Sequence, residues 1–153
     1  MRVLETWVSD PLSRFLTESA ARVVLLMTSS GQVVAQHGFT RSVDVMSAAA
    51  LGAGIMASTG ELARIMGSPR FGALVHQGTD QGMLLAGFDT PRGRWIGLVV
   101  YGPETSLGLV QLFFQQFTDE IAAAAPPEES RGPVLAENFE HELNASLRAL
   151  FGR

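Results

Sequence analysis

The sequence predicts a mixed α/β (α+β) fold, a five-stranded antiparallel sheet with helices on both faces, followed by an amphipathic C-terminal helix. Short β-branched runs occur in two groups, a pair and a triplet, separated by turn residues that are typical of antiparallel strands. A long apolar helix connects the groups, and a further helix flanks each end. An antiparallel sheet and apolar helices bury their surfaces best by packing in layers.

The chain has 153 residues, enough for one domain with its own core. We expect that domain to span residues 1–125. Residues 126–133 are rich in proline and glutamate, which predicts a linker. Residues 134–153 predict an amphipathic helix, whose apolar side would carry Leu135, Phe139, Leu143, Leu147 and Leu150.

The first half of the domain begins with a helix, for which Asp10 is the expected N-cap and Pro11 the first helical residue. Residues 1–9 either extend this helix or form a lead-in, and the sequence leaves both open. Residues 22–28 and 32–37 predict two strands. The turn Ser29-Ser30-Gly31 between them makes a β-hairpin.

A long helix over residues 44–67 is the most informative segment, because both of its faces are apolar. We expect one face to pack on the sheet, with Ala48, Leu51, Ile55, Leu62, Ile65 and Met66. The opposite face holds small residues and is interrupted only by Arg64. A further element of the same chain or a second molecule has to cover it. The second molecule is favoured, since the chain has few elements to spare and small residues let two helices approach closely.

The second half of the domain predicts a three-stranded meander over residues 71–76, 82–88 and 95–101. A helix follows over residues 105–125. Its apolar residues repeat at spacings of three and four, which predicts a core-facing side with Leu107, Val110, Phe114, Phe117 and Ile121.

The composition excludes several kinds of chemistry. The chain contains no Cys and no Lys, so it has no thiolate nucleophile, Schiff-base lysine or P-loop lysine. The histidines at 37, 76 and 141 lie far apart and match no metal-ligand spacing. We therefore expect no catalytic residue, no cofactor and no metal site. Net charge is −4 with scattered arginines, which argues against nucleic-acid binding.

Membrane insertion and secretion are not expected either. The long uncharged stretch at residues 45–60 is shorter than the ~20 residues that a membrane span requires. Glu5 and Asp10 interrupt the apolar residues near the start, so no signal peptide is predicted. The absence of Cys fits a cytoplasmic location.

The order of elements resembles the roadblock/LC7 family over about residues 12–125. The segments that carry the resemblance are Val24–Ala35 for the first hairpin, the small-residue helix from Asp44, and Ser106–Val110 at the start of the last core helix. Within the family, the chain is most similar to the MglB group. That similarity rests on Arg70-Phe71 with the strand leading to Gly78, and on the added helix that ends in Leu143–Phe151.

The resemblance implies a homodimer in which the middle strands pair into one continuous sheet and the long helices lie side by side. It also implies that the dimer binds a small Ras-like GTPase of the MglA type and speeds GTP hydrolysis without an arginine finger. The dimer interface would contain Met46, Ala49, Ala53, Met56, Ala57, Gly60, Phe71, Leu74 and Val75. The GTPase-binding residues would be Ala63, Arg64, Phe139, Leu143 and Leu147.

Two other functions remain open at this stage. The first is a roadblock scaffold or adaptor that binds a partner without changing its hydrolysis rate. The second is a ligand-sensing domain, for which Phe88, Trp95 and Tyr101 would line a pocket. The simpler interpretation of these aromatic residues is that they fill the faces of the sheet.

Overall fold

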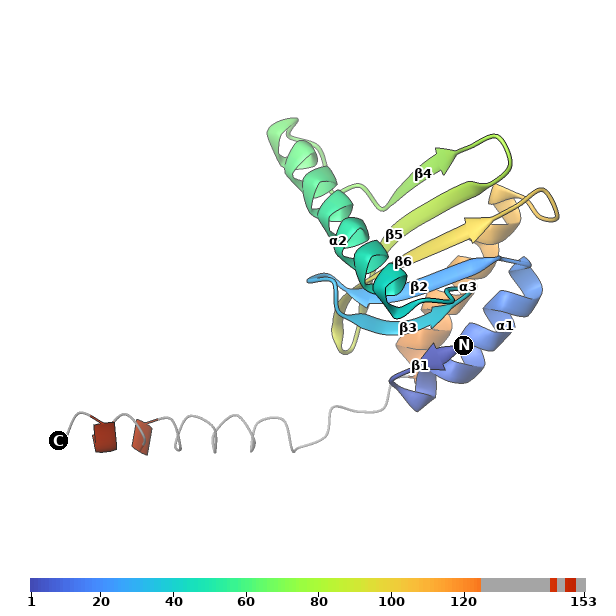
Figure 1. Cartoon of the computed structure of the whole chain (residues 1–153). Coiled ribbons are helices and arrows are strands. Elements are labelled where there is room, and N and C mark those ends of the chain that lie inside the picture. The colour runs from blue at the N-terminus through green and yellow to red at the C-terminus, as the bar shows by residue number, and fades with distance from the viewer. Residues whose placement is uncertain (125–143, 146–147, 151–153) are drawn as a thin grey trace.

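The computed structural model describes residues 1–124, 144–145 and 148–150. Its centre is an antiparallel sheet of six strands in the order β1-β3-β2-β6-β5-β4 (Figure 1). Three helices pack on the two faces of this sheet. In chain order the elements are β1 (Arg2–Val3), α1 (Thr6–Ser19), β2 (Val23–Thr28), β3 (Val33–His37), α2 (Ser42–Ile65), β4 (Ala73–Gln77), β5 (Gly82–Thr90), β6 (Gly93–Tyr101) and α3 (Leu107–Ala124).

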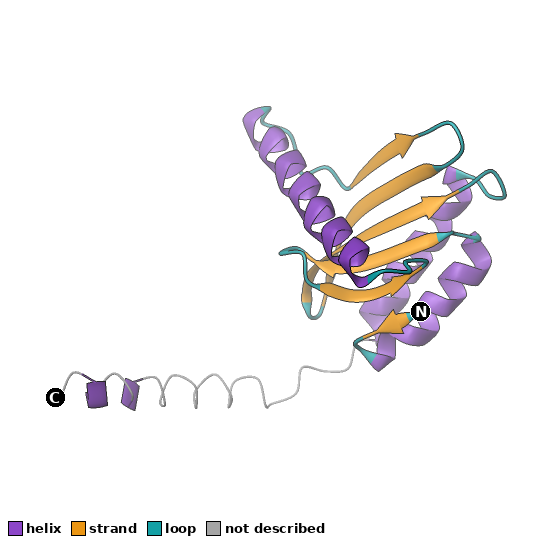
Figure 2. Cartoon of the chain, in the orientation of Figure 1, coloured by secondary structure: helices purple, strands orange, loops and turns teal. Residues whose placement is uncertain are grey.

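The domain has three layers, with α2 on one face of the sheet and α1 and α3 on the other (Figure 2). This confirms the expected fold class, including helices on both faces. The sheet has one strand more than expected, because β1 pairs with β3 through Arg2 and Val3. A strand of two residues is too short to produce a periodic sequence pattern.

The predicted start of the first helix was wrong. Helix α1 begins at Thr6, its N-cap residue Glu5 makes no side-chain capping hydrogen bond, and Pro11 lies inside the helix. Asp10 is therefore an ordinary helical residue. Pro11 removes one backbone hydrogen bond, to the carbonyl of Trp7. Burial of Val8, Leu12 and Phe15 against the sheet and α3 offsets this loss, so tertiary packing overrides the local start signal.

The layer under α1 and α3 is an aromatic core. The predicted face of α3 is confirmed, since Val110, Phe114, Phe117 and Ile121 are all buried. Phe88 meets the edge of Phe114 with ring centroids 5.6 Å apart. Phe88 and Trp95 are themselves buried in this cluster. Tyr101 is buried in the same cluster, so these aromatic side chains fill the sheet's face, as the simpler interpretation expected.

The expected orientation of α2 was wrong: the helix faces the sheet with its small residues. Val45, Ala49 and Gly52 are buried, whereas Leu51, Leu62 and Ile65 are exposed. The contact is close, because a Cβ atom added at Gly52 would lie 3.1 Å from Met27 Cε and 3.4 Å from Met27 Sδ. Small side chains let the helix axis come near the sheet. The large apolar residues are consequently directed outwards.

The ends of α2 also differ from the prediction in part. The helix begins at Ser42, and its N-cap is Arg41 rather than Asp44, without a side-chain capping bond. The stop near Gly67 is confirmed. Gly67 has a φ of 64°, a left-handed conformation that favours glycine, and Ser68 N–H donates to the Ala63 carbonyl at 2.9 Å. This turn encloses the end of the helix, and Ala63 is buried.

Substitution of Gly52 tests the close approach of α2 to the sheet. Gly52→Leu would overpack the contact with Met27, so we expect its free energy of unfolding to be about 2 kcal/mol below that of Gly54→Leu. Gly54 is the matched control, since a Cβ atom there meets nothing within 4 Å. Both variants gain the same helix propensity. Chemical denaturation measures the difference, and equal stabilities would contradict a tight contact at Gly52.

Candidate protein-interaction surface

One side of α2 carries a row of apolar residues, here named the α2 stripe: Leu51, Ile55, Leu62, Ile65 and Met66. Of these, Ile55 is partly buried against the core beneath α2. Leu51, Leu62, Ile65 and Met66 have exposed fractions of 68%, 55%, 67% and 59%. Exposure on this scale along one helix face is unusual for a monomer that has no partner. The stripe is therefore the strongest candidate for a protein contact in the described chain.

The spacing of the stripe matches a helix–helix contact. Leu51, Ile55, Ser58, Leu62 and Ile65 follow one another at intervals of four, three, four and three residues. This is the interval pattern of the core positions in a pair of supercoiled helices. Ser58 is the one polar residue in the row. A second helix lying along α2 would cover the row over about two heptads.

The second feature is the edge strand β4. It pairs with β5 on one side, and its other side faces solvent at the end of the sheet (Figure 1). Val75 on this strand is 37% exposed, and Phe71 just before the strand is 39% exposed. The sequence predicted a strand over residues 71–76, and the structure places it at Ala73–Gln77. An edge strand offers unpaired N–H and C=O groups to a further strand.

The structure corrects two of the predicted interface residues. Ala49 is fully buried against the sheet, and Ala63 is buried at the C-terminal end of α2, so neither is available to a partner. Ala53, Met56 and Leu74 are partly buried and pack against the apolar core between α2 and the sheet. Sequence reasoning assigned the stripe residues to the core, because both faces of α2 are apolar and periodicity alone does not rank them.

The remaining predicted contact residues of the domain are accessible. Met46, Ala57, Gly60, Phe71 and Val75 are exposed. Arg64 is exposed as well, and its Nε donates to Glu61 Oε1 at 2.9 Å on the same helix face. These positions stay predictions, since accessibility permits a contact without identifying the partner.

The predicted tail residues Phe139, Leu143 and Leu147 lie outside the described residues, as do the linker 126–133 and most of the segment 134–153. In that segment, residues 144–145 and 148–150 have helical backbone conformation. Leu150 is 78% exposed.

The described residues hold no group of three or more His, Asp and Glu side chains close enough to bind a metal ion. His37 and His76 belong to different strands, at opposite ends of the sheet order. The turn at Ser29-Ser30-Gly31 is held by its own hydrogen bonds, with Thr28 Oγ1 3.0 Å from Ser30 Oγ and 3.1 Å from the Gln32 N–H nitrogen that donates to it. Its serines are accounted for by turn geometry.

Helix α2 is long enough and apolar enough to cross a membrane, judged by length and composition alone. Its position in the fold argues against membrane insertion. Leu25, Met27 and Leu85 are fully buried in the cluster beneath α2, and moving the helix into a bilayer would expose them. We therefore interpret the α2 stripe as a surface for protein contacts.

Comparisons with known proteins agree with the fold. No protein-family model and no curated protein matches the sequence. Among solved structures, MglB of Myxococcus xanthus is 29% identical with a TM-score of 0.70, covering 78% of this chain and 95% of that one. The gliding protein MglB of Thermus thermophilus is 27% identical with a TM-score of 0.68, covering 80% and 94%.

A more distant structure confirms the fold alone. A roadblock/LC7 domain from Streptomyces avermitilis is 15% identical with a TM-score of 0.61, and the match covers 78% of this chain and 95% of that one. The two MglB structures share both the fold and more than a quarter of the aligned residues with this chain. The chain is therefore an MglB-like protein with the roadblock/LC7 fold.

Proposed function

We propose that the protein is a homodimeric, non-catalytic regulator of a small Ras-like GTPase of the MglA type. The observation that carries the proposal is the combination of the exposed α2 stripe and the open β4 edge in one MglB-like chain. Both are surfaces that suit protein partners, and the described residues offer no constellation for chemistry of their own.

In the proposed dimer, β4 of one protomer pairs with β4 of the other and extends the sheet across both. This pairing satisfies the backbone groups that the edge leaves free. The two α2 helices then lie along each other through their stripes. Leu51, Leu62 and Ile65 thus take the place that sequence reasoning gave to the small-residue face. Met46, Ala57 and Gly60 lie roughly 120° to 180° around the helix from Leu51 and Leu62, so they would stay outside this contact.

The dimer would bind the GTPase on its α2 side, with Arg64 and the tail residues Phe139, Leu143 and Leu147 as proposed contacts. Acceleration of hydrolysis needs no catalytic group from this chain. A partner that binds the hydrolysis-competent conformation of the GTPase more tightly than the other conformations shifts the population towards it. The reacting groups then belong to the GTPase alone.

The alternative is a scaffold that binds a GTPase or another partner and leaves the hydrolysis rate unchanged. The same surfaces would serve it, since an apolar stripe and an open edge provide binding in either case. Binding without a rate change distinguishes this alternative from regulation. Both versions place the protein in the cytoplasm, beside its partner.

The first prediction concerns the dimer surface. Leu51→Glu places a charge within the proposed helix contact, and we expect the dimer dissociation constant to rise about a hundredfold. Ala57→Glu is the matched control on the exposed flank of the same helix. Sedimentation equilibrium measures both variants. If Ala57→Glu separates the protomers and Leu51→Glu does not, the small-residue face is the interface after all.

The second prediction concerns regulation. We expect the cognate Ras-like GTPase to hydrolyse GTP at least tenfold faster with saturating dimer, which corresponds to about 1.4 kcal/mol off the barrier. Single-turnover hydrolysis with and without the protein measures the effect. Co-elution of the two proteins with an unchanged rate would establish the scaffold alternative instead.

The third prediction separates the domain from the tail. Deletion of residues 126–153 should weaken the effect on GTP hydrolysis while leaving the dimer intact, because the proposed dimer surfaces lie in residues 1–125. Hydrolysis rate and molar mass in solution are measured on the same preparation. A truncated chain that is monomeric would mean that the tail belongs to the dimer.

A further inference from the structure

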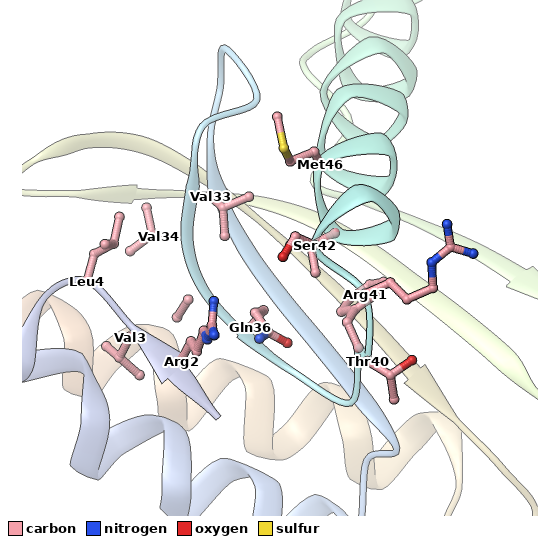
Figure 3. Close-up of a pocket in the computed structure, with 13 residues that line it drawn as sticks. Arg2, Val3, Leu4, Val33, Val34, Gln36, Thr40, Arg41, Ser42 and Met46 are labelled. Carbon is pink, nitrogen blue, oxygen red and sulfur yellow. The ribbon is translucent and has the colours of Figure 1, made fainter.

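A groove of about 670 Å³ lies between the β1–β3 edge of the sheet and the first turns of α2 (Figure 3). Its walls are largely apolar, with Leu4 and Val34 on one side and Val33 and Met46 nearer α2. Leu4 and Met46 are 79% and 68% exposed. A groove of this volume accommodates several apolar side chains.

The groove is also electropositive. Arg2 on β1 lines it, and none of the described residues that line it is acidic. Arg41 at the start of α2 also lines it, but its guanidinium is directed away from Arg2 in Figure 3. Arg41 meets Asp44 only at 3.9 Å, with both side chains exposed. The start of α2 adds backbone N–H groups without a side-chain cap, and Gln36 Oε1 is buried beside them with no hydrogen-bond partner among the described residues.

We propose that this groove binds residues 134–147 of the same chain while no GTPase is bound. The inference rests on the proposed function in one respect, because the tail would leave the groove to contact the GTPase through Phe139, Leu143 and Leu147. The segment is apolar along one side, which matches the apolar walls of the groove. It also carries acidic side chains, which complement the basic charge of the groove. Its apolar residues Leu135, Phe139, Leu143 and Leu147 recur every four positions, and it contains three glutamates and no arginine. In the helix that the sequence predicts for this segment, at about 100° per residue, Glu140 and Glu142 would lie on opposite borders of the apolar side, where Arg2 would meet one of them.

The chain is long enough to bring the segment there. Helix α3 ends at Ala124, beside the start of α1 (Figure 1). Strand β1 comes just before α1 in the chain, so the end of α3 also lies near β1. Residues 125–133 span up to about 30 Å when extended, enough to pass around the β1 edge to the groove.

The test exploits the absence of cysteine from the natural sequence. A full-length chain with Met46→Cys and Leu143→Cys would form an intramolecular disulfide under mild oxidation, because docking holds the two side chains close together. The matched control pairs Leu143→Cys with Leu112→Cys, an exposed position on α3 whose exposed fraction is 52%, against 68% for Met46. Both pairs share the same tether, so random collision of the tail affects both.

We expect the groove pair to close at least tenfold faster than the control pair, as followed by non-reducing electrophoresis and peptide mass mapping. Equal rates would overturn the proposal, since the tail would then sample both faces alike. A disulfide formed mainly between two chains would also overturn it, because the groove would then receive a second copy.

A charge reversal supplies the second measurement. Arg2→Glu should slow closure of the groove pair about threefold, in keeping with a partly exposed ion pair. Adding Glu142→Arg should restore the rate. Slowing without restoration would contradict the charge pairing. Because these experiments use the protein alone, their failure leaves the proposed GTPase regulation untouched.

Discussion

The close contact between α2 and the sheet is the constraint on which the rest of the surface depends. At Gly52 the backbone of the helix approaches Met27 so closely that an added Cβ atom would lie 3.1 Å away. A helix held this near must turn its small residues inwards, where a larger side chain would overpack the contact. The stripe of large apolar residues on the outside follows directly, and with it the need for a partner.

Topology supplies the second half of the same surface. Helix α2 links β3, near one end of the strand order, to β4 at the other. The crossover leaves β4 paired on one side only and brings the chain to it directly from the end of the α2 stripe. An open strand edge and an apolar helix are thus consecutive in the chain. A second copy that covers one is well placed to cover the other.

The α2 stripe and the β4 edge are surfaces that suit binding. The chain has no Cys and no Lys, which excludes thiolate and lysine chemistry, and His37 and His76 lie on separate strands. Regulation by such a protein depends on which conformation of a partner it binds most tightly. The basic groove beside β1 adds a separate surface that is suited to an acidic, amphipathic segment.

The sequence alone determined the hairpin, the meander and the buried face of α3, because local periodicity and turn residues fix each of them. It also excluded thiolate and lysine chemistry through its composition. The position of β4 at the edge of the sheet depends on the strand order, which only the tertiary structure gives. Tertiary structure alone decided which face of α2 is buried. Both faces are apolar, so the hydrophobic pattern gives no preference, and the choice depends on the distance between helix and sheet at Gly52. The same holds for β1 and for Pro11 inside α1, which packing against distant residues stabilises despite weak or contrary local signals.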